Sequence, residues 1–145
     1  MRTSPLGPAG SLGMGLSFGM GCAVAARLED SDRRIFVMLG DGEIQEGSIW
    51  EAAMAARHHE LGNLKVILDR NRIQNDDFCE VQMRMFDIPA KWKAFGWSVK
   101  EIDGHNMNEV MEGLDFLEQT NDGPSILIAH TIKGAGISYM ENNPS

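Results

Sequence analysis

Two continuous apolar runs constrain the fold of this chain more than any other feature. Residues 33–39 read RRIFVML, and residues 63–69 read NLKVILD. Uninterrupted apolar strands are typical of a parallel sheet that is covered on both faces. The stretch between them, residues 46–62, is alanine-rich, has an acidic residue at its start and ends at Gly62, a pattern that predicts a helix. The chain therefore contains a predicted strand–helix–strand unit.

The flanking segments continue this alternation. Residues 11–28 are predicted to form a helix with one face of small residues, Gly15, Gly19 and Ala23, on which another backbone could pack closely. Residues 77–95 show no clear pattern, apart from a short helix expected over 87–96. We expect strands at 97–103 and 124–132 and a helix at 106–120. The sequence thus predicts one α/β domain over residues 1–145, a parallel sheet flanked by helices with right-handed crossovers.

Charge and composition exclude several classes of function. The chain of 145 residues has a net charge of −8 and 13 scattered basic residues, which argues against nucleic-acid binding. It contains no apolar run long enough to span a bilayer, and its first residues lack the pattern of a secretory signal. Cys22 and Cys79 match neither a metal motif nor a disulfide framework, so we expect reduced thiols in a cytoplasmic protein.

Polar residues stand at the ends of the first two predicted strands. Asp41 follows the first strand and Asn71 follows the second. Neighbouring strands lie about 5 Å apart, so adjacent strands would bring both side chains to one ion. Their oxygens suit Mg²⁺ or Ca²⁺ better than Zn²⁺. Gly40 and Gly42 would let main-chain N–H groups approach phosphate oxygens, although the same turn could instead use Asp41 as a helix N-cap.

The two strand ends together resemble a known cofactor motif. Gly40-Asp41-Gly42, followed by Asn71 after a helix and a strand, resembles the thiamine diphosphate-binding motif. The longer stretches GDGEIQEGSIWEAA and DRNRIQND resemble the transketolase family, especially the amino-terminal subunit of split transketolases. GSLGMG at 10–15, IDGHN at 102–106 and TIKGAGISYMENN at 131–143 extend the resemblance over nearly the whole chain, in family order.

The resemblance implies a role for particular residues. Mg²⁺ would be held by Asp41, Asn71 and the main-chain carbonyl of Ile73. The thiazolium and aminopyrimidine end of the cofactor would be bordered by Gly10, Ser11, Leu12 and Gly13, and the diphosphate end by Gly40, Gly42, Glu43 and Asn71. Lys133 either faces the diphosphate or is an ordinary loop lysine. Glu46 stands where a family glutamate joins a polar network between two cofactor sites, although it could also serve as a helix-dipole partner.

The resemblance also implies a partner. In the family, the glutamate that activates the aminopyrimidine lies on a pyrimidine-binding domain, and the resemblance implies that this domain comes from another chain. The chain looks truncated at both ends, and several family histidines have no counterpart in it. We therefore expect a subunit that transfers a two-carbon ketol unit only with a carboxy-terminal partner chain, within a homo- or hetero-oligomer. The isolated chain is expected to be sticky or marginally stable.

Two other functions remain open at this point. The chain could belong to another thiamine diphosphate enzyme, such as a 2-oxoacid dehydrogenase component or a deoxyxylulose phosphate synthase, with an acyl or ketose donor. It could also be a catalytically incomplete subunit that only binds a partner. Among the histidines, we expect His58 and His59 at an exposed helix end, His105 to support a turn, and His130 to be a core residue rather than a ligand contact.

Overall fold

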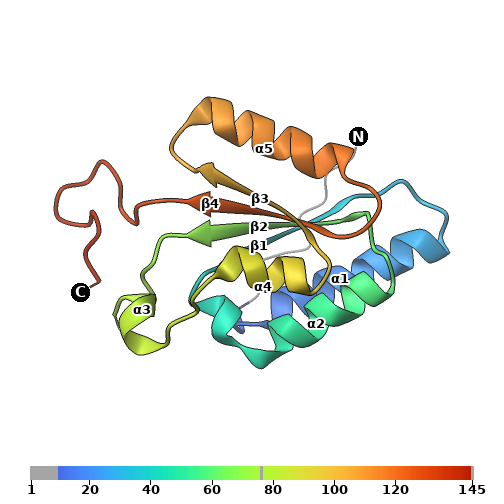
Figure 1. Ribbon diagram of the computed structural model, residues 1–145, viewed down its shortest axis with the longest axis horizontal. Coiled ribbons are helices and arrows are strands. Elements are labelled where there is room, and N and C mark those ends of the chain that lie inside the picture. Colours follow the sequence, from blue (N-terminus) through green and yellow to red (C-terminus); the bar gives the residue numbers. More distant parts are fainter. Residues whose placement is uncertain (1–9, 76, 145) are drawn as a thin grey trace.

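The computed structural model describes residues 10–75 and 77–144 (Figure 1). Four parallel strands form one sheet in these residues, in the spatial order β1-β2-β4-β3. They are β1 (Ile35–Gly40), β2 (Leu64–Arg70), β3 (Ser98–Asp103) and β4 (Ser125–His130). The predicted parallel α/β sheet is confirmed, with each strand within two residues of its expected bounds.

Helices lie on both faces of this sheet (Figure 1). Helices α1, α2 and α4 cover one face, and α5 lies on the other. Their bounds are α1 (Met14–Leu28), α2 (Gly47–His58), α4 (Ile88–Ala94) and α5 (Met107–Gln119); a 3₁₀ turn, η1 (Glu43–Gln45), and a short helix, α3 (Cys79–Gln82), lie near the carboxyl ends of the strands. The helix predicted over 46–62 ends earlier, at His58, because Glu60 adopts a positive φ of 50°.

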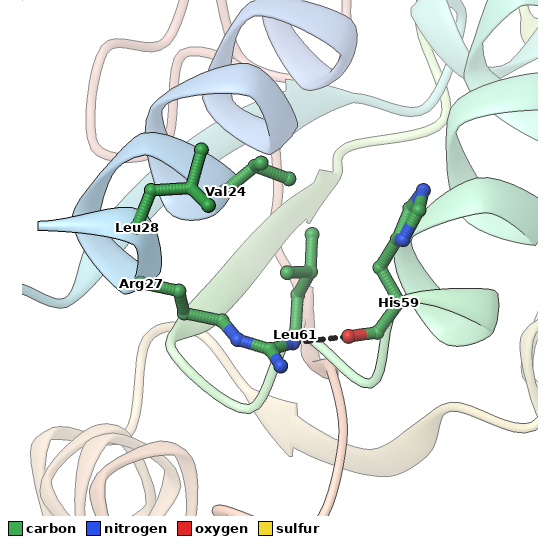
Figure 2. Close-up of a pocket in the computed structure, with 5 residues that line it drawn as sticks. All are labelled: Val24, Arg27, Leu28, His59 and Leu61. Carbon is green, nitrogen blue, oxygen red and sulfur yellow. Dashed lines mark hydrogen bonds between the residues drawn. The ribbon is translucent and has the colours of Figure 1, made fainter. Parts of the chain in front are cut away.

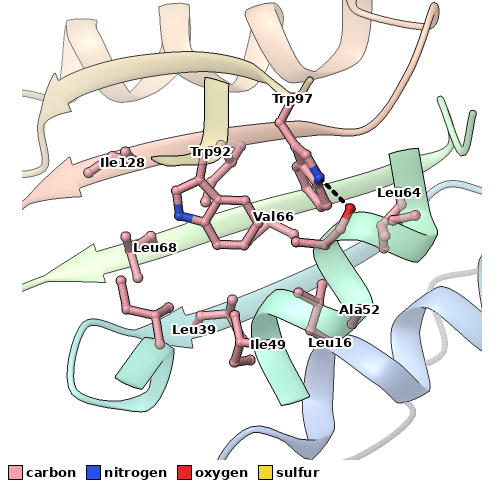
Figure 3. Close-up of a cluster of buried hydrophobic side chains, with 14 of the residues drawn as sticks. Leu16, Leu39, Ile49, Ala52, Leu64, Val66, Leu68, Trp92, Trp97 and Ile128 are labelled. Carbon is pink, nitrogen blue, oxygen red and sulfur yellow. Dashed lines mark hydrogen bonds between the residues drawn. The ribbon is translucent and has the colours of Figure 1, made fainter. Parts of the chain in front are cut away.

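The main core lies between the sheet and α1, α2 and α4 (Figure 3). Trp92 and Trp97 pack edge to face there, with ring centroids 4.8 Å apart, and the indole Nε1–H of Trp97 donates to the Ala53 carbonyl at 3.0 Å. The small face predicted for α1 is used at Gly19, where a Cβ would collide with the Val37 side chain. A glycine at this position lets α1 pack directly on β1.

One expectation about β1 is wrong. Its apolar run predicted cover on both faces, but Phe36 is 48% exposed and Met38 is 70% exposed. Both side chains lie on the α5 side of the sheet, and β1 is at the sheet edge. Within the described residues, α5 packs on β3 and β4 and does not reach over β1. The apolar run therefore predicted the strand correctly, but it did not predict how much of the strand the helices cover.

The remaining expectations about individual side chains have mixed outcomes. Cys22 and Cys79 are free thiols. His58 and His59 are exposed at the end of α2, as expected. His130 is not a core residue; it is half-buried at the end of β4, with Nε2 2.8 Å from a carboxylate oxygen of Glu101. In the part of the chain that the structure describes, no helix has the length and apolarity needed to cross a membrane.

Candidate functional site

The ends of β1 and β2 bring the two predicted metal ligands to one edge of the sheet. The strands are parallel neighbours, and Gly40 pairs with Asp69 in their register. Asp41 follows directly, and its N–H donates to the Asp69 carbonyl at 3.2 Å. The Asp41 carboxylate in turn accepts the N–H of Arg72 at 2.6 Å, so it lies against the segment that carries Asn71. The sheet thus places both residues as the strand spacing predicted.

Asp41 is a buried carboxylate, with a relative exposure of only 4%. Its second oxygen accepts the thiol of Cys79 at 3.4 Å. Burial raises the pKa of Asp41, while hydrogen bonds from Arg72 and Cys79 act in the opposite direction. Burial, together with the adjacent Asp41, also raises the pKa of Cys79 to about 12. A buried carboxylate with neutral hydrogen-bond donors favours a bound cation at this place.

Asn71 is oriented by its neighbours on both sides of the amide. Its Nδ2 donates to the Asp69 carboxylate at 2.9 Å, and its Oδ1 accepts the N–H of Ile73 at 3.0 Å. The other Asp69 oxygen accepts the hydroxyl of Thr131, which follows β4. Asp69 is a residue that the sequence reasoning missed. The position of Asp69, two residues before Asn71, could have indicated this contact, because alternate residues of an extended strand face the same side.

The donor chemistry of this edge fits magnesium. Asp41, Asn71 and the Ile73 carbonyl offer hard oxygen atoms, and a carboxylate or amide oxygen that accepts one hydrogen bond keeps further lone-pair capacity. In residues 10–75 and 77–144, no group of three or more His, Cys, Asp or Glu side chains is arranged to hold a metal. The candidate site instead combines one carboxylate with amide and main-chain oxygens, a set suited to Mg²⁺ that also binds phosphate and water.

The glycine loop, residues 10–13, lies beside the turn that carries Asp41. The N–H of Gly13 donates to one carboxylate oxygen of Glu43, and the N–H of Gly40 donates to the other, both at 3.1 Å. The carbonyl of Gly13 accepts the hydroxyl of Ser48 at 3.0 Å. The two segments expected at opposite ends of the cofactor are therefore joined through Gly13. Ser48 was not predicted, although it lies within the EIQEGS stretch.

The remaining candidates lie around this edge. Glu46 is exposed at the N-terminus of α2, and its side chain makes no capping hydrogen bond there. Lys133 is exposed in the loop that follows β4. His105 supports the start of that loop, as predicted, because its Nε2 accepts the N–H of Ile132 at 2.8 Å. Ser11 and Leu12 are exposed before α1.

A cleft at the opposite end of the sheet lacks comparable chemistry. It lies between the last turns of α1 and α2 and the residues that lead into β2 (Figure 2). It is lined by three apolar side chains and by Arg27 and His59, and Arg27 donates to the main-chain carbonyl of His59 across it. Because ligands of parallel α/β sheets bind beyond the carboxyl ends of the strands, the edge with Asp41 is the better candidate.

The fold and this edge define a parallel α/β domain with a candidate cofactor site at the carboxyl ends of its strands. Comparison with known families gives the particular class: residues 3–144 match the family described as transketolase, thiamine diphosphate binding domain. The chain therefore belongs to the transketolase family and corresponds to its amino-terminal, thiamine diphosphate-binding part.

Individual relatives agree with this assignment. The chain is 46% identical over 132 residues to an apulose-4-phosphate transketolase subunit of Phocaeicola vulgatus, covering 91% of this chain and 47% of that protein. It is 39% identical to the 6-deoxy-6-sulfo-D-fructose transketolase subunit SqwG of a Clostridium species, covering 91% and 48%. The Campylobacter jejuni transketolase structure superposes with a TM-score of 0.88 at 28% identity, covering 93% and 22%. The chain thus spans about half the length of these two transketolase subunits.

Proposed function

We propose that this chain is the thiamine diphosphate- and Mg²⁺-binding part of a two-component transketolase. Together with a partner chain that carries a pyrimidine-binding domain, it would transfer a two-carbon ketol unit from a ketose donor to an aldehyde acceptor. The observation that carries the proposal is the placement of Asp41 and the Asn71 segment at neighbouring strand ends, in a chain of the transketolase family.

The proposed metal ligands are Asp41, Asn71 Oδ1 and the Ile73 carbonyl. Burial of Asp41 supports this role, because a bound cation would offset the cost of a charged carboxylate in the interior. Asp69 would keep the Asn71 oxygen directed correctly by holding the amide nitrogen. Ca²⁺ prefers the same oxygens and is the alternative ion.

The proposed diphosphate contacts come from main-chain groups of the turn at 40–43, not from the Glu43 side chain, and from Lys133. At Gly42, a Cβ would lie 2.8 Å from the Gln74 side chain, so glycine lets the turn pack this closely. Residues 10–13 would border the ring end of the cofactor. When bound, thiamine diphosphate supplies the chemistry that carries the two-carbon unit, while the chain binds and orients it.

Glu46 is the proposed link to a second cofactor site. It is exposed and does not cap α2, which leaves its carboxylate available to a partner surface. The names of the relatives support a two-chain enzyme, since the proteins of Phocaeicola vulgatus and Actinobacillus succinogenes are each named as one subunit of an apulose-4-phosphate transketolase. The free thiols fit a cytoplasmic location. We propose that the chain is a single domain that is inactive without its partner, within an oligomer.

The decisive experiment is calorimetric titration of thiamine diphosphate into this chain, with Mg²⁺ present. It is done with the chain alone and with a separately purified pyrimidine-domain subunit of a split transketolase. We expect binding that requires Mg²⁺ and is strongest with the partner, followed by ketol transfer from ketose phosphates in a coupled assay. Absence of binding in both conditions would contradict the proposal. Binding without ketol transfer from any ketose would favour another thiamine diphosphate reaction.

Asp41→Ala tests the metal assignment. We expect it to weaken Mg²⁺-dependent cofactor binding by about 100-fold or more, since even outer-shell groups change metal affinity by about 10–100-fold. The fold should remain, because the substitution removes a buried charge. Calorimetry measures the binding loss, and circular dichroism checks the fold. Asp115→Ala on the exposed side of α5 is the matched control and should bind like the wild type. Unchanged affinity in Asp41→Ala would refute the assignment.

A further inference from the structure

Glu43 contacts two segments that are far apart in the sequence. One of its carboxylate oxygens accepts the N–H of Gly13, thirty residues earlier, and the other accepts the N–H of Gly40 in the same turn. Both distances are 3.1 Å, and both hydrogen bonds are partly buried. A single side chain therefore joins the glycine loop 10–13 to the strand-end turn 40–43.

Gly13 is held from its other side as well. Its carbonyl accepts the Ser48 hydroxyl, and its φ of +80° lies in the left-handed region that favours glycine. A Cβ at Gly13 would lie 2.5 Å from the Ser48 oxygen and 2.8 Å from the Glu46 Cβ, so no side chain fits there. The loop thus contacts residues 43, 46 and 48 at a point where only glycine allows the approach.

The charge of Glu43 argues against a direct contact with the diphosphate. A carboxylate beside phosphate oxygens is repulsive, whereas here both of its oxygens already accept main-chain N–H groups. Hydrogen bonds to an ionised acceptor are stronger than neutral ones, so this arrangement holds the loop firmly. Glu43 therefore acts through the loop rather than on the cofactor itself.

We propose that Glu43 is a positioning residue that holds the glycine loop 10–13 against the turn 40–43. The ring end and the diphosphate end of the cofactor site are thereby assembled before any ligand binds. This inference rests on the proposed function, because the two ends are defined by the expected cofactor. The hydrogen bonds themselves are a property of the free chain and can be tested without it.

Amide hydrogen exchange of the free chain, measured by NMR, gives the first test. In Glu43→Ala, the amides of Gly13 and Gly40 should exchange at least about tenfold faster, while amides in β2 keep their rates. In Glu43→Gln, which is isosteric, at least one of the two should be affected, since a carboxamide offers one acceptor oxygen. Glu51→Gln, exposed on α2, is the control and should change neither. Unchanged Gly13 exchange in both Glu43 variants would overturn the inference.

Ligand titration gives the second test, in whichever condition the wild type binds. With Mg²⁺ present, Glu43→Ala should raise the Kd of thiamine diphosphate about tenfold. The ring end of this cofactor would contact the loop 10–13, which the variant no longer holds in place. The Kd of inorganic pyrophosphate, which lacks the ring end, should rise clearly less, by about threefold at most, because the diphosphate end loses only the hydrogen bond at Gly40. Equal losses for both ligands would overturn the inference, because Glu43 would then act on the diphosphate end.

The two proposals fail in distinguishable ways. A wild-type chain that binds neither ligand, alone or with the partner, would refute the proposed function, and the exchange rates of Gly13 would still decide whether Glu43 holds the loop. Should Glu43→Ala fail to fold, Glu43→Gln provides the same two measurements with the side-chain volume preserved. Slow Gly13 exchange in that variant, with Gly40 also unchanged, would refute the positioning role.

Discussion

The two faces of the sheet differ in how completely they are covered. On one face, α1, α2 and α4 enclose a core in which Trp92 is fully buried against Trp97 (Figure 3). On the other face, α5 buries Leu117 in a smaller cluster, while Phe36 remains about half exposed and Met38 largely exposed. The strands supply apolar side chains to both faces. The difference therefore arises from the helices, and it shows that strand composition alone does not determine cover.

The two faces also differ in the kind of group that they bury. The covered face consists mainly of interlocking apolar groups, whereas the α5 face contains a buried lysine, Lys65, at the start of β2. Its Nζ donates to the main-chain carbonyl of Thr120 at the end of α5. The first face should therefore respond to changes of volume and the second to changes of charge.

The largest expected effect lies in the covered core. Trp92→Ala should lower the free energy of unfolding by about 3–5 kcal/mol, because a fully buried indole leaves a cavity that the surrounding helices cannot fill. Phe36→Ala on the open face should change it by no more than about 0.5 kcal/mol. Urea denaturation monitored by circular dichroism measures both. Similar losses in the two variants would remove the distinction between the faces.

A pair of glycines in α1 sharpens the same comparison. Gly19→Ala should destabilise the chain by about 1–3 kcal/mol, since its Cβ would meet Val37 on the covered face. Gly21→Ala should stabilise it by about 0.5–1 kcal/mol, because open space surrounds Gly21 and alanine is the better helix former. Thermal melts of both variants test this. A stabilising Gly19→Ala would mean that α1 does not pack directly on β1.

Lys65→Met probes charge on the second face. Burial lowers the pKa of Lys65, the nearby Arg34 lowers it further, and Asp122 partly opposes them. We expect the methionine variant to be about 1 kcal/mol more stable at pH 7. The folded chain binds this proton less tightly than the unfolded chain, so the cost of the charge is relieved as the pH rises toward 10.5. The advantage of the variant should therefore shrink with pH.

Thermal melts at pH 7 and pH 9.5 measure that trend. Lys93→Met, on the exposed side of α4, is the matched control, and its difference from the wild type should be small at both values of pH. A Lys65→Met variant that is less stable than the wild type at pH 7 would show that the hydrogen bond to Thr120 outweighs the cost of burial.

The smallest effect on stability is expected for the double variant Phe36→Ser and Met38→Ser. Both side chains are exposed, so the free energy of unfolding should change by no more than about 0.5 kcal/mol. Self-association of the isolated chain should decrease, because the substitutions remove an exposed apolar patch. Sedimentation velocity measures this. Unchanged association would indicate that the open face is not the surface responsible for it.

Much of the fold could be predicted from the sequence. Apolar runs and helical periodicity are local patterns, and they located the strands to within two residues. Helix ends were harder to predict. Helix α2 ends at His58, because Glu60 has a positive φ, and no glycine marks that position in the sequence. The exposure of Phe36 could not be predicted, because cover depends on where α5 packs.

The candidate site divides in a similar way. Asp41 and Asn71 could be located because each directly follows a predicted strand, and parallel strands end at the same edge. Asp69 and Cys79, which contact these two residues, were missed. Cys79 lies on a short helix 38 residues after Asp41, and no local pattern indicates that contact.

The sequence by itself determined the α/β alternation, the polar residues at the strand ends and the resemblance to transketolases, because each follows from the order of short motifs along the chain. Only the tertiary structure decided the strand order, the open face of β1 and the attachment of Gly13 to Glu43. Those features depend on which distant segments meet. The meeting is set by the packing of whole helices on the sheet, which residue spacing along the chain does not encode.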